Sequence, residues 1–209
     1  MTEEFSALGD HYFSAQPASP NQTRPVRVDI CGQSVELVTA RGVFSPGHID
    51  VGTAELLRRV DPPPTGGNLL DLGCGWGPIA LTMATLAPLA TVWAVDINER
   101  SLELTAQNAA IMQCENVRPA QPDQVPPGVH FDAIWSNPPI RIGKTALHEL
   151  LIKWLPRLTP DGEAWLVVQR NLGADSLRAW LNSEFPVPVM AEKFSSSKGF
   201  QVIRVSLGN

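Results

Sequence analysis

The sequence NLLDLGCGWGP occupies residues 68–78, where a short apolar stretch runs into a glycine-rich turn and then into a helical pattern. The alternate glycines Gly73, Gly75 and Gly77 let the backbone approach a ligand closely at a helix N-terminus. Pro78 suits the first helical turn, where its missing N–H costs nothing, and residues 79–87 continue as an apolar helix. This stretch predicts a strand, a ligand-binding loop and a helix, as at the start of a doubly wound α/β sheet.

The type of ligand is indicated by the glycine spacing and by Asp71. Dinucleotide sites also use a glycine-rich turn, but their pattern is Gly-x-Gly-x-x-Gly, whereas this chain has Gly-x-Gly-x-Gly. A carboxylate at position 71, beside the loop, would repel a pyrophosphate and attract a sulfonium or ammonium group. S-adenosylmethionine carries both of these cations, so it is the expected cofactor.

Two further acidic residues follow predicted strands. Asp96 ends the strand at residues 91–95, where its carboxylate could accept both ribose hydroxyls of a nucleoside; alternatively it caps a helix at residues 98–110, a role that Asn98 could also fill. Asp123 ends a weaker strand pattern at residues 116–123 and either accepts the adenine amine or is a solvated loop acid.

The motif SNPPI, residues 136–140, directly follows the apolar run FDAIW at residues 131–135. The two prolines stiffen the loop, so the Asn137 side chain and the Pro138 carbonyl become fixed acceptors, with Pro139 holding the geometry. An amine conjugated to a planar ring is a poor nucleophile. Accepting both of its hydrogens aims the nitrogen lone pair at an electrophile, which is what N-methylation of a base or an amide requires. An isolated Asn-Pro pair would instead indicate an ordinary turn.

The rest of the chain completes the predicted fold, a Rossmann-like, doubly wound, seven-stranded and mostly parallel sheet with an antiparallel last strand. Residues 1–60 should form an N-terminal hairpin (26–39) and helix (50–60) that roof the cofactor, and residues 61–209 the catalytic core, in one structural domain overall. Further along the core we expect a helix at 145–158, with His148 on its face, followed by a turn at 161–162 and a strand at 163–168. The chain should end with a helix at 173–182 and two strands, at 187–193 and 200–207, which are joined by a loop at 195–199. The ligand crevice should lie at the carboxyl ends of the first and fourth core strands.

These motifs resemble the methyltransferase small-domain family of class I S-adenosylmethionine-dependent methyltransferases, and most closely its RsmC-like group, which methylates the 2-amino group of guanine in ribosomal RNA. The resemblance covers nearly the whole chain. It rests on HYFS at 11–14, GVFS at 42–45, DVGT at 50–53, the glycine loop, VDINER at 95–100 and, most specifically, SNPPIRIGK at 136–144.

The resemblance implies roles for particular residues. The methionine part of the cofactor would be held by Asp71, Gly73, Gly75 and Gly77, its ribose by Asp96 and its adenine by Asp123, and the cofactor would also contact Phe44, Ile97 and Asn137. The target amine would be bound by Asn137 together with Pro138 and Pro139. The RNA would contact Ile140, Arg141 and Lys144. One position departs from the pattern. Many amino-methyltransferases have an aromatic residue after the two prolines, and this chain has Ile140, so base stacking must come from Phe44, Phe194 or Phe200, or be replaced by apolar contact.

Composition narrows the class of protein further. A chain of 209 residues with 44% apolar content can build one sizeable core, so we expect a single catalytic domain without a separate recognition module. The net charge of −5 disfavours tight binding to free RNA, although Arg141 and Lys144 follow the target-amine loop directly. Other cations could frame the same face or be scattered and solvated: Arg24, Arg27, Arg41, Lys193, Lys198 and Arg204. Ribosomal RNA in a subunit or an assembly particle is therefore the expected partner.

Cysteine usage and the N-terminus indicate a cytoplasmic protein. Cys31, Cys74 and Cys114 are few and widely spaced, which is typical of reduced thiols, and neither a Cys-x-x-Cys pair nor a histidine cluster indicates a metal site. The acidic start of the chain and the absence of an 18-residue apolar run argue against a secretory signal or a membrane span. A monomer or a weak homodimer is expected.

The reaction we expect is direct in-line transfer of a methyl group to an exocyclic amine. Three alternatives remain open. The target could be a glutamine amide of a translation factor, which poses the same chemical problem. It could be a DNA adenine, which the missing target-recognition domain disfavours. The protein could instead be a non-catalytic ribosome assembly factor that binds S-adenosylmethionine or RNA, which the intact Asp71, Asp96 and Asn137 disfavour.

Overall fold

The computed structural model describes residues 22–208, apart from the side chain of Arg141. The HYFS motif at residues 11–14, which contributed to the family resemblance, lies outside the described residues.

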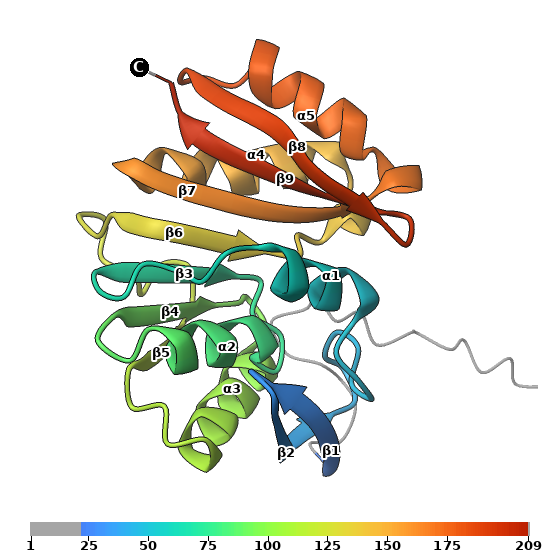
Figure 1. Ribbon diagram of the computed structural model, residues 1–209, viewed down its shortest axis with the longest axis vertical. Helices are drawn as coiled ribbons and strands as arrows, with labels where there is room; N and C mark the ends of the chain where they lie inside the picture. Colours follow the sequence, from blue (N-terminus) through green and yellow to red (C-terminus); the bar gives the residue numbers. More distant parts are fainter. Residues whose placement is uncertain (1–21, 209) are drawn as a thin grey trace, which may run out of the picture.

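A seven-stranded sheet forms the centre of the molecule (Figure 1), in the order β5-β4-β3-β6-β7-β9-β8. Neighbouring strands from β5 to β7 run parallel, and β9 runs antiparallel between β7 and β8. This arrangement confirms the predicted fold class, including the antiparallel last strand. The bounds are β3 Asn68–Leu72, β4 Thr91–Val95, β5 Val117–Ala120, β6 Phe131–Ser136, β7 Leu158–Gln169, β8 Val189–Ser197 and β9 Phe200–Leu207.

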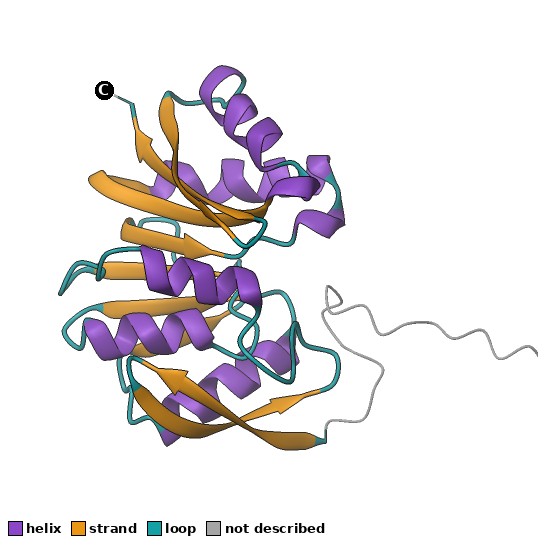
Figure 2. Cartoon of the chain, turned by 45° about the vertical axis from the view of Figure 1, so that its right-hand side comes forward, coloured by secondary structure: helices purple, strands orange, loops and turns teal. Residues whose placement is uncertain are grey.

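Helices cover both faces of the sheet (Figure 2). On one face, buried side chains of α1 (Val51–Arg59), α2 (Pro78–Leu86) and α3 (Glu99–Ile111) share a core with the sheet. On the other face, α4 (Lys144–Trp154) and α5 (Ala174–Ser183) form a second core. The strand order reverses between β3 and β6: after β3 the chain adds strands on one side of the sheet, and from β6 onwards it adds them on the other. A crevice is expected at the carboxyl ends of these two strands, because their connections leave on opposite faces there.

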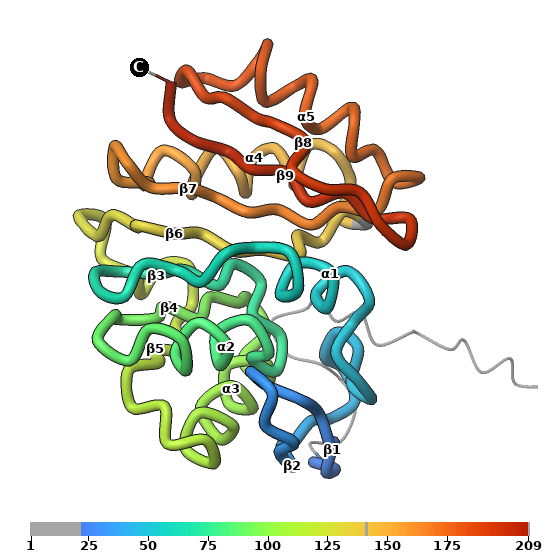
Figure 3. The backbone as a smooth tube through the Cα atoms, in the orientation of Figure 1, coloured from blue at the N-terminus to red at the C-terminus, as the bar shows by residue number. Residues whose placement is uncertain are grey.

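The N-terminal hairpin consists of β1 (Thr23–Ile30) and β2 (Gln33–Ala40), and it lies beside α3 at one end of the molecule (Figure 3). Its buried side chains join the first core. The Asn108 side chain of α3 holds the hairpin in place: its Oδ1 accepts from the Val38 N–H at 2.8 Å, and its Nδ2 donates to the Val38 carbonyl at 2.9 Å. The chain then returns from β2 towards the carboxyl end of the sheet.

Two predicted turns are wrong, one at the start of β7 and one between β8 and β9. The residues expected to form a turn, Asp161 and Gly162, lie inside β7, at an irregularity where Phe131 pairs with Leu158 but Ala133 pairs with Glu163. The expected loop at 195–199 is a two-residue turn, because β8 continues to Ser197, which pairs with Phe200. In both places residues with turn propensity are drawn into the sheet by strand pairing, which their local sequence does not encode.

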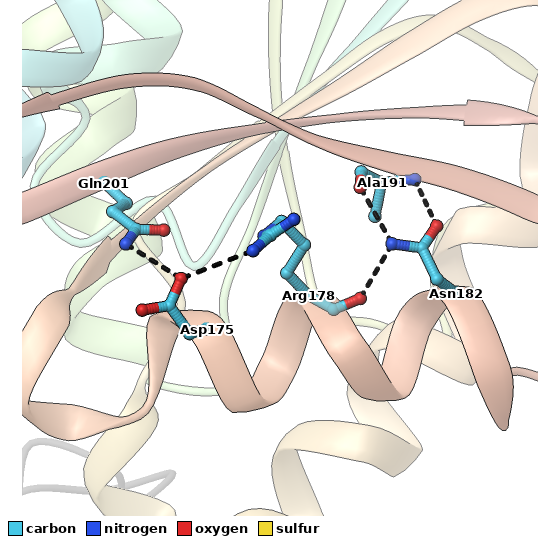
Figure 4. Close-up of polar contacts among 5 residues, drawn as sticks. All are labelled: Asp175, Arg178, Asn182, Ala191 and Gln201. Atoms are coloured by element: carbon cyan, nitrogen blue, oxygen red, sulfur yellow. Dashed lines mark hydrogen bonds and ion pairs between the residues drawn. The ribbon is translucent and has the colours of Figure 1, made fainter.

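Polar contacts join α5 to the last two strands (Figure 4). The Asn182 side chain both accepts from the Ala191 N–H and donates to the Ala191 carbonyl, each at 2.9 Å. Nearby, the buried Gln201 amide donates to the Asp175 carboxylate at 3.1 Å. These contacts hold the β8-β9 hairpin against α5.

Within residues 22–208, no group of three or more histidine, cysteine or acidic side chains is placed to hold a metal ion. No helix of the same part of the chain has both the length and the apolar character needed to cross a membrane. Cys31, Cys74 and Cys114 are free thiols.

Candidate active site

A pocket of about 740 Å³ opens where β3, β4 and β6 end, at the place predicted from the strand order. Its walls come from the loops after these strands, the segment before α1, the side of α4, and the facing ends of β7 and β9. The residues that line it are Phe44, Asp50, Leu72, Gly73, Gly75, Val95, Asp96, Ile97, Ser101, Pro122, Asn137, Pro138, Pro139, Ile140, Ile142, Ala146, Glu149, Leu150, Lys153, Trp154, Gln169, Leu172 and Phe200.

The glycine loop supplies an open backbone cradle. Gly73 and Gly75 have φ angles of +82° and +57°, and a Cβ on either would point into open space. The loop is tied to β4, since the Gly73 N–H donates to the Val95 carbonyl at 2.8 Å. Gly77 has a different role: it does not line the pocket, and a Cβ there would lie 3.1 Å from the Thr105 side chain. Its small size lets α2 and α3 approach each other.

Asp71 lies beneath the loop and does not line the pocket. It is fully buried, and its Oδ2 accepts from the Ala80 N–H in the first turn of α2 at 2.9 Å, while no partner is found for Oδ1 among the described residues. Burial raises the pKa of Asp71 to about 8, against the lowering effect of the Ala80 N–H. The sequence predicted a carboxylate facing the cofactor. In the structure, Asp71 joins β3 to α2 and shapes the loop from below.

Asp96 occupies the position predicted for a ribose ligand, at the tip of β4 and in the pocket wall. Its Oδ2 accepts from the Gly75 N–H and its Oδ1 from the Asn98 N–H, each at 2.9 Å. Burial raises its pKa, and these N–H donors oppose the rise. The Ile97 N–H and the Ser101 side chain also donate to this carboxylate, so Asp96 is held firmly at the wall of the pocket. Asn98, and not Asp96, caps α3, by accepting from the Arg100 and Ser101 N–H groups.

Of two further residues predicted to contact the cofactor, Ile97 reaches the pocket, and Asp123, the residue predicted near the adenine, does not. Ile97 lines the pocket with 48% of its surface exposed, which suits an apolar contact with a planar ring. Asp123 is exposed in the loop after β5, while its neighbour Pro122 lines the pocket. Two polar side chains of α4, Glu149 and Lys153, lie in the wall instead.

The segment between β2 and α1 lines part of the pocket, whereas the hairpin that was expected to roof the cofactor contributes none of its described residues to the pocket wall. Phe44 lines the pocket and is 39% exposed. The backbone on both sides of Phe44 is held by side chains of the core: Asn98 Nδ2 donates to the Gly42 carbonyl at 2.8 Å, and Trp76 Nε1 donates to the Ser45 carbonyl at 3.2 Å.

Asn137 is held by a contact that the sequence did not predict. Its Nδ2 donates to Asp50 Oδ2 at 2.9 Å and to Thr53 Oγ1 at 3.1 Å. A carboxylate can only accept, so the amide nitrogen must face Asp50 and the amide oxygen must face the other way. Asp50 and Asn137 both line the pocket. Of the two polar atoms of the Asn137 amide, this arrangement leaves Oδ1 to accept a hydrogen bond from a ligand.

The loop after Asn137 is a tight turn. Pro139 has φ −74° and ψ 74°, close to an inverse γ-turn, and the Ile140 N–H donates to the Pro138 carbonyl at 2.8 Å. A carbonyl oxygen has two lone pairs, so Pro138 keeps one for a second donor. Pro138, Pro139 and Ile140 all line the pocket, which brings the predicted amine-binding loop and the glycine loop to one cavity.

The cations predicted to frame this face are only partly available. Three are held in ion pairs: Arg27 with Glu36, Lys198 with Glu55, and Arg204 with Glu163. Lys144, the first residue of α4, is exposed beside the target-amine loop but is not part of the pocket wall. The backbone of Arg141 lies in the short helix Ile140–Ile142, and its side chain lies outside the described residues.

The pocket residues that sequence reasoning missed include Asp50 and Gln169, and it also missed Thr53, which contacts Asn137. Asp50 and Thr53 belong to the DVGT stretch at 50–53, where an aspartate at the start of a helical pattern is a signal for an N-cap that could have marked Asp50. In the structure Asp50 does cap α1, and it also binds Asn137. No local signal marks Gln169, which reaches the pocket because it is the last residue of β7, a strand placed by its pairing with β6 and β9.

The geometry is that of a Rossmann-like methyltransferase, and comparisons with known proteins place the chain in a family. Residues 34–204 match the model of the methyltransferase small domain, so the chain belongs to this family. Membership confirms the expected class, an S-adenosylmethionine-dependent methyltransferase. The site suits that cofactor, because it combines an open glycine cradle, the carboxylate of Asp96 and the apolar face of Ile97.

Particular relatives differ in how much they share with this chain. It is 32% identical over 200 residues to the uncharacterized protein YbxB of Bacillus subtilis, covering 94% of this chain and 98% of that one. It is 35% identical over 178 residues to ribosomal RNA small subunit methyltransferase C of Hahella chejuensis, covering 82% of this chain and 50% of the relative. The chain therefore spans about half the length of the methyltransferase C relatives.

A solved structure shares the fold. The Thermus thermophilus 16S rRNA N2 G1207 methyltransferase RsmC, in complex with AdoMet and guanosine, superposes with a TM-score of 0.72 at 22% identity. The match covers 90% of this chain and 52% of that enzyme.

Proposed function

We propose that this protein is an S-adenosylmethionine-dependent N-methyltransferase that methylates the exocyclic 2-amino group of a guanine in small-subunit ribosomal RNA. The observation that carries the proposal is the orientation of Asn137. Its amide nitrogen is bound by Asp50 and Thr53, which leaves Oδ1 as an acceptor in the cavity that also contains the glycine loop and Asp96.

The proposed mechanism relies on positioning. The bound cofactor supplies an electrophilic methyl group on a sulfonium. Asn137 Oδ1 and the free lone pair of the Pro138 carbonyl accept the two N–H groups of the target amine, which turns the nitrogen lone pair out of conjugation and towards that methyl group. After transfer, the nitrogen is a positively charged amine that is acidic enough to lose a proton to solvent. No strong base is needed.

The choice of a nucleic-acid substrate is supported by the relatives. The methyltransferase C proteins are named for the small-subunit ribosomal RNA, and the Thermus enzyme that shares the fold is named for the N2 position of a guanine. These proteins are about twice as long as the part that this chain matches.

A ribosomal subunit or an assembly particle is the substrate we favour over protein-free RNA. The net charge is −5, and three of the candidate RNA-binding cations are held in ion pairs with acids of this chain. Because phosphate contacts dominate affinity for free RNA, a particle whose proteins add contacts would bind better. Such a substrate would place the reaction in the cytoplasm.

The test uses the purified protein and S-adenosylmethionine labelled at the methyl group. Small subunits from cells that lack this protein, protein-free 16S RNA and a ribosome-free protein extract are incubated separately, and the RNA is digested to nucleosides. We expect labelled N2-methylguanosine, with a higher yield from the subunit than from free RNA. Asn137→Ala is the control that should lose the product while still binding the cofactor.

Other outcomes would replace the proposal. Label in a protein band would indicate a glutamine amide as the target. Label in N6-methyladenosine would indicate a different base. Cofactor binding without any transfer would favour a non-catalytic assembly factor.

A further inference from the structure

Phe200, the first residue of β9, lies in the wall of the pocket on the side of the target-amine loop. It lines the same cavity as Asn137, Pro138 and Ile140, and its ring is half-buried against the first core. Gln169 of β7 is paired with it directly, so the two side chains stand on the same face of the sheet, and both line the pocket.

The turn before Phe200 holds it rigidly. Lys198 and Gly199 both have positive φ angles, +46° and +82°, as in the two-residue turns that match the twist of a hairpin. Lys198 Nζ lies 3.2 Å from Glu55 Oε1 on α1, and the Arg170 N–H donates to the Gly199 carbonyl at 2.8 Å. The turn is thus tied both to α1 and to the end of β7.

The ring itself is backed by Gly52 in the first turn of α1. A Cβ on Gly52 would lie 2.9 Å from Cε1 of Phe200, so only glycine leaves room for the ring at this position. Gly52 also donates its N–H to Asp50, the residue that holds Asn137. The aromatic ring and the amine-binding amide therefore rest on the same turn of one helix.

The other aromatic side chains are less well placed for a target base. Phe44 also lines a small cavity that contains Gly73 and Gly75 as well as Asn137, so it lies between the glycine loop and the target-amine loop. Phe194 does not line the pocket, and its ring meets Trp165 edge-on at 4.8 Å. Trp154 borders the pocket but is fully buried, with the Arg157 guanidinium 4.9 Å from its ring.

We propose that Phe200 stacks on the target base, in place of the aromatic residue that many amino-methyltransferases carry at the position of Ile140. The inference rests on the proposed function, because it assumes that a planar base enters this side of the pocket. Its physical basis is that every base has a π-face, so a fixed ring at this wall can hold a base while Asn137 and Pro138 hold its amine.

Two measurements test the role of Phe200. The first is the KM for the RNA substrate, which Phe200→Leu should raise on the order of tenfold to a hundredfold while leaving cofactor affinity within a few-fold. The second uses 2-aminopurine riboside, a fluorescent nucleoside with a 2-amino group, added to the protein saturated with S-adenosylhomocysteine. Stacking quenches its fluorescence, so we expect quenching by the wild type and little by Phe200→Leu.

Two further variants separate stacking from a structural role. Phe200→Tyr keeps an aromatic ring and should restore both the KM and the quenching. Phe194→Leu changes an exposed ring of the same hairpin outside the pocket and should behave as the wild type.

The failures of this inference and of the proposed function can be told apart. Suppose that the wild type methylates RNA and quenches the fluorescence of the nucleoside, and that Phe200→Leu does both equally well. Phe200 is then not the stacking residue, and the proposed function stands. Equal loss in Phe194→Leu would likewise overturn the assignment. If the wild type neither methylates RNA nor quenches the nucleoside, both proposals fall.

Discussion

The side-chain amide nitrogen of Asn137 lies 2.9 Å from Asp50 Oδ2, although 87 residues separate them in the chain. The same carboxylate oxygen accepts from the Gly52 N–H at 2.8 Å and so caps α1. One oxygen atom therefore joins the N-terminal segment to the loop after β6. It fixes which end of the Asn137 amide faces the pocket, and the first two predictions follow from this contact.

Replacing Asn137 should affect the chemical step and not cofactor binding. Asn137→Ala removes the Oδ1 acceptor that orients the amine, so we expect the single-turnover rate to fall on the order of a hundredfold or more. Calorimetry should find cofactor affinity within a few-fold of wild type. Near-normal turnover in a folded variant would remove the amine-binding mechanism.

Asp50 can be tested by separating its two contacts. Serine caps helices well but is too short to reach Asn137, so Asp50→Ser should keep the melting temperature near wild type and lower kcat roughly tenfold. Asp50→Asn retains an oxygen that can accept from both the Gly52 N–H and the Asn137 amide, and should keep more activity than Asp50→Ser. The same kcat in both variants would show that the contact with Asn137 does not matter.

Asp96 should contribute directly to cofactor affinity. Asp96→Ala removes the carboxylate at the tip of β4 and with it up to two charge-assisted hydrogen bonds to the ribose, which should weaken binding by roughly 1–3 kcal/mol in calorimetry. Asp123→Ala is the matched comparison, since Asp123 is exposed and does not line the pocket. We expect the cofactor affinity of Asp123→Ala to lie within twofold of wild type. A large loss of cofactor affinity in this variant would support the adenine role predicted from the sequence.

Asp71 should make the stability of the protein depend on pH. Its pKa is raised to about 8 in the folded state, whereas an unfolded aspartate titrates near pH 4. The unfolded state therefore loses this proton first, and the free energy of unfolding should fall as pH rises from about 4 to about 8.

Asp71→Asn cannot ionise, and its oxygen can still accept from the Ala80 N–H. Urea unfolding at several pH values should show that the free energy of unfolding of the variant exceeds that of the wild type, by a difference that grows to a few kcal/mol by pH 8. Parallel curves for the two proteins would mean that Asp71 is ionised in the folded state.

Lys144 should contribute one phosphate contact if the substrate is RNA. Lys144→Ala should weaken RNA binding and lower the slope of log affinity against log salt by roughly one. Arg27→Ala is the control, because Arg27 lies on the N-terminal hairpin and pairs with Glu36. A similar slope change in both variants would indicate diffuse charge in place of a contact beside the pocket.

Local sequence patterns predicted much of the secondary structure of the core. The apolar run at residues 91–95 became β4 with the predicted bounds, and the run at 200–207 became β9. Asp50 and Asn98 cap helices as aspartate and asparagine before an apolar pattern should. These features depend on residues within one or two turns of each other, so the sequence encodes them directly. Alternation of such strands and helices then predicts a doubly wound sheet and a crevice at its carboxyl edge.

Only the tertiary structure decided which polar groups reach that crevice. Asp71 and Asp123 were both assigned to the cofactor from their places in or after predicted strands, yet one is buried beneath the loop and the other is exposed away from the pocket. Where a carboxylate lies depends on which N–H groups and side chains distant elements bring to it, and burial then changes its ionisation. The contact between Asp50 and Asn137 and the pairing of Gln169 with Phe200 have the same origin: each joins residues far apart in the chain, through packing and strand register that a local pattern does not contain.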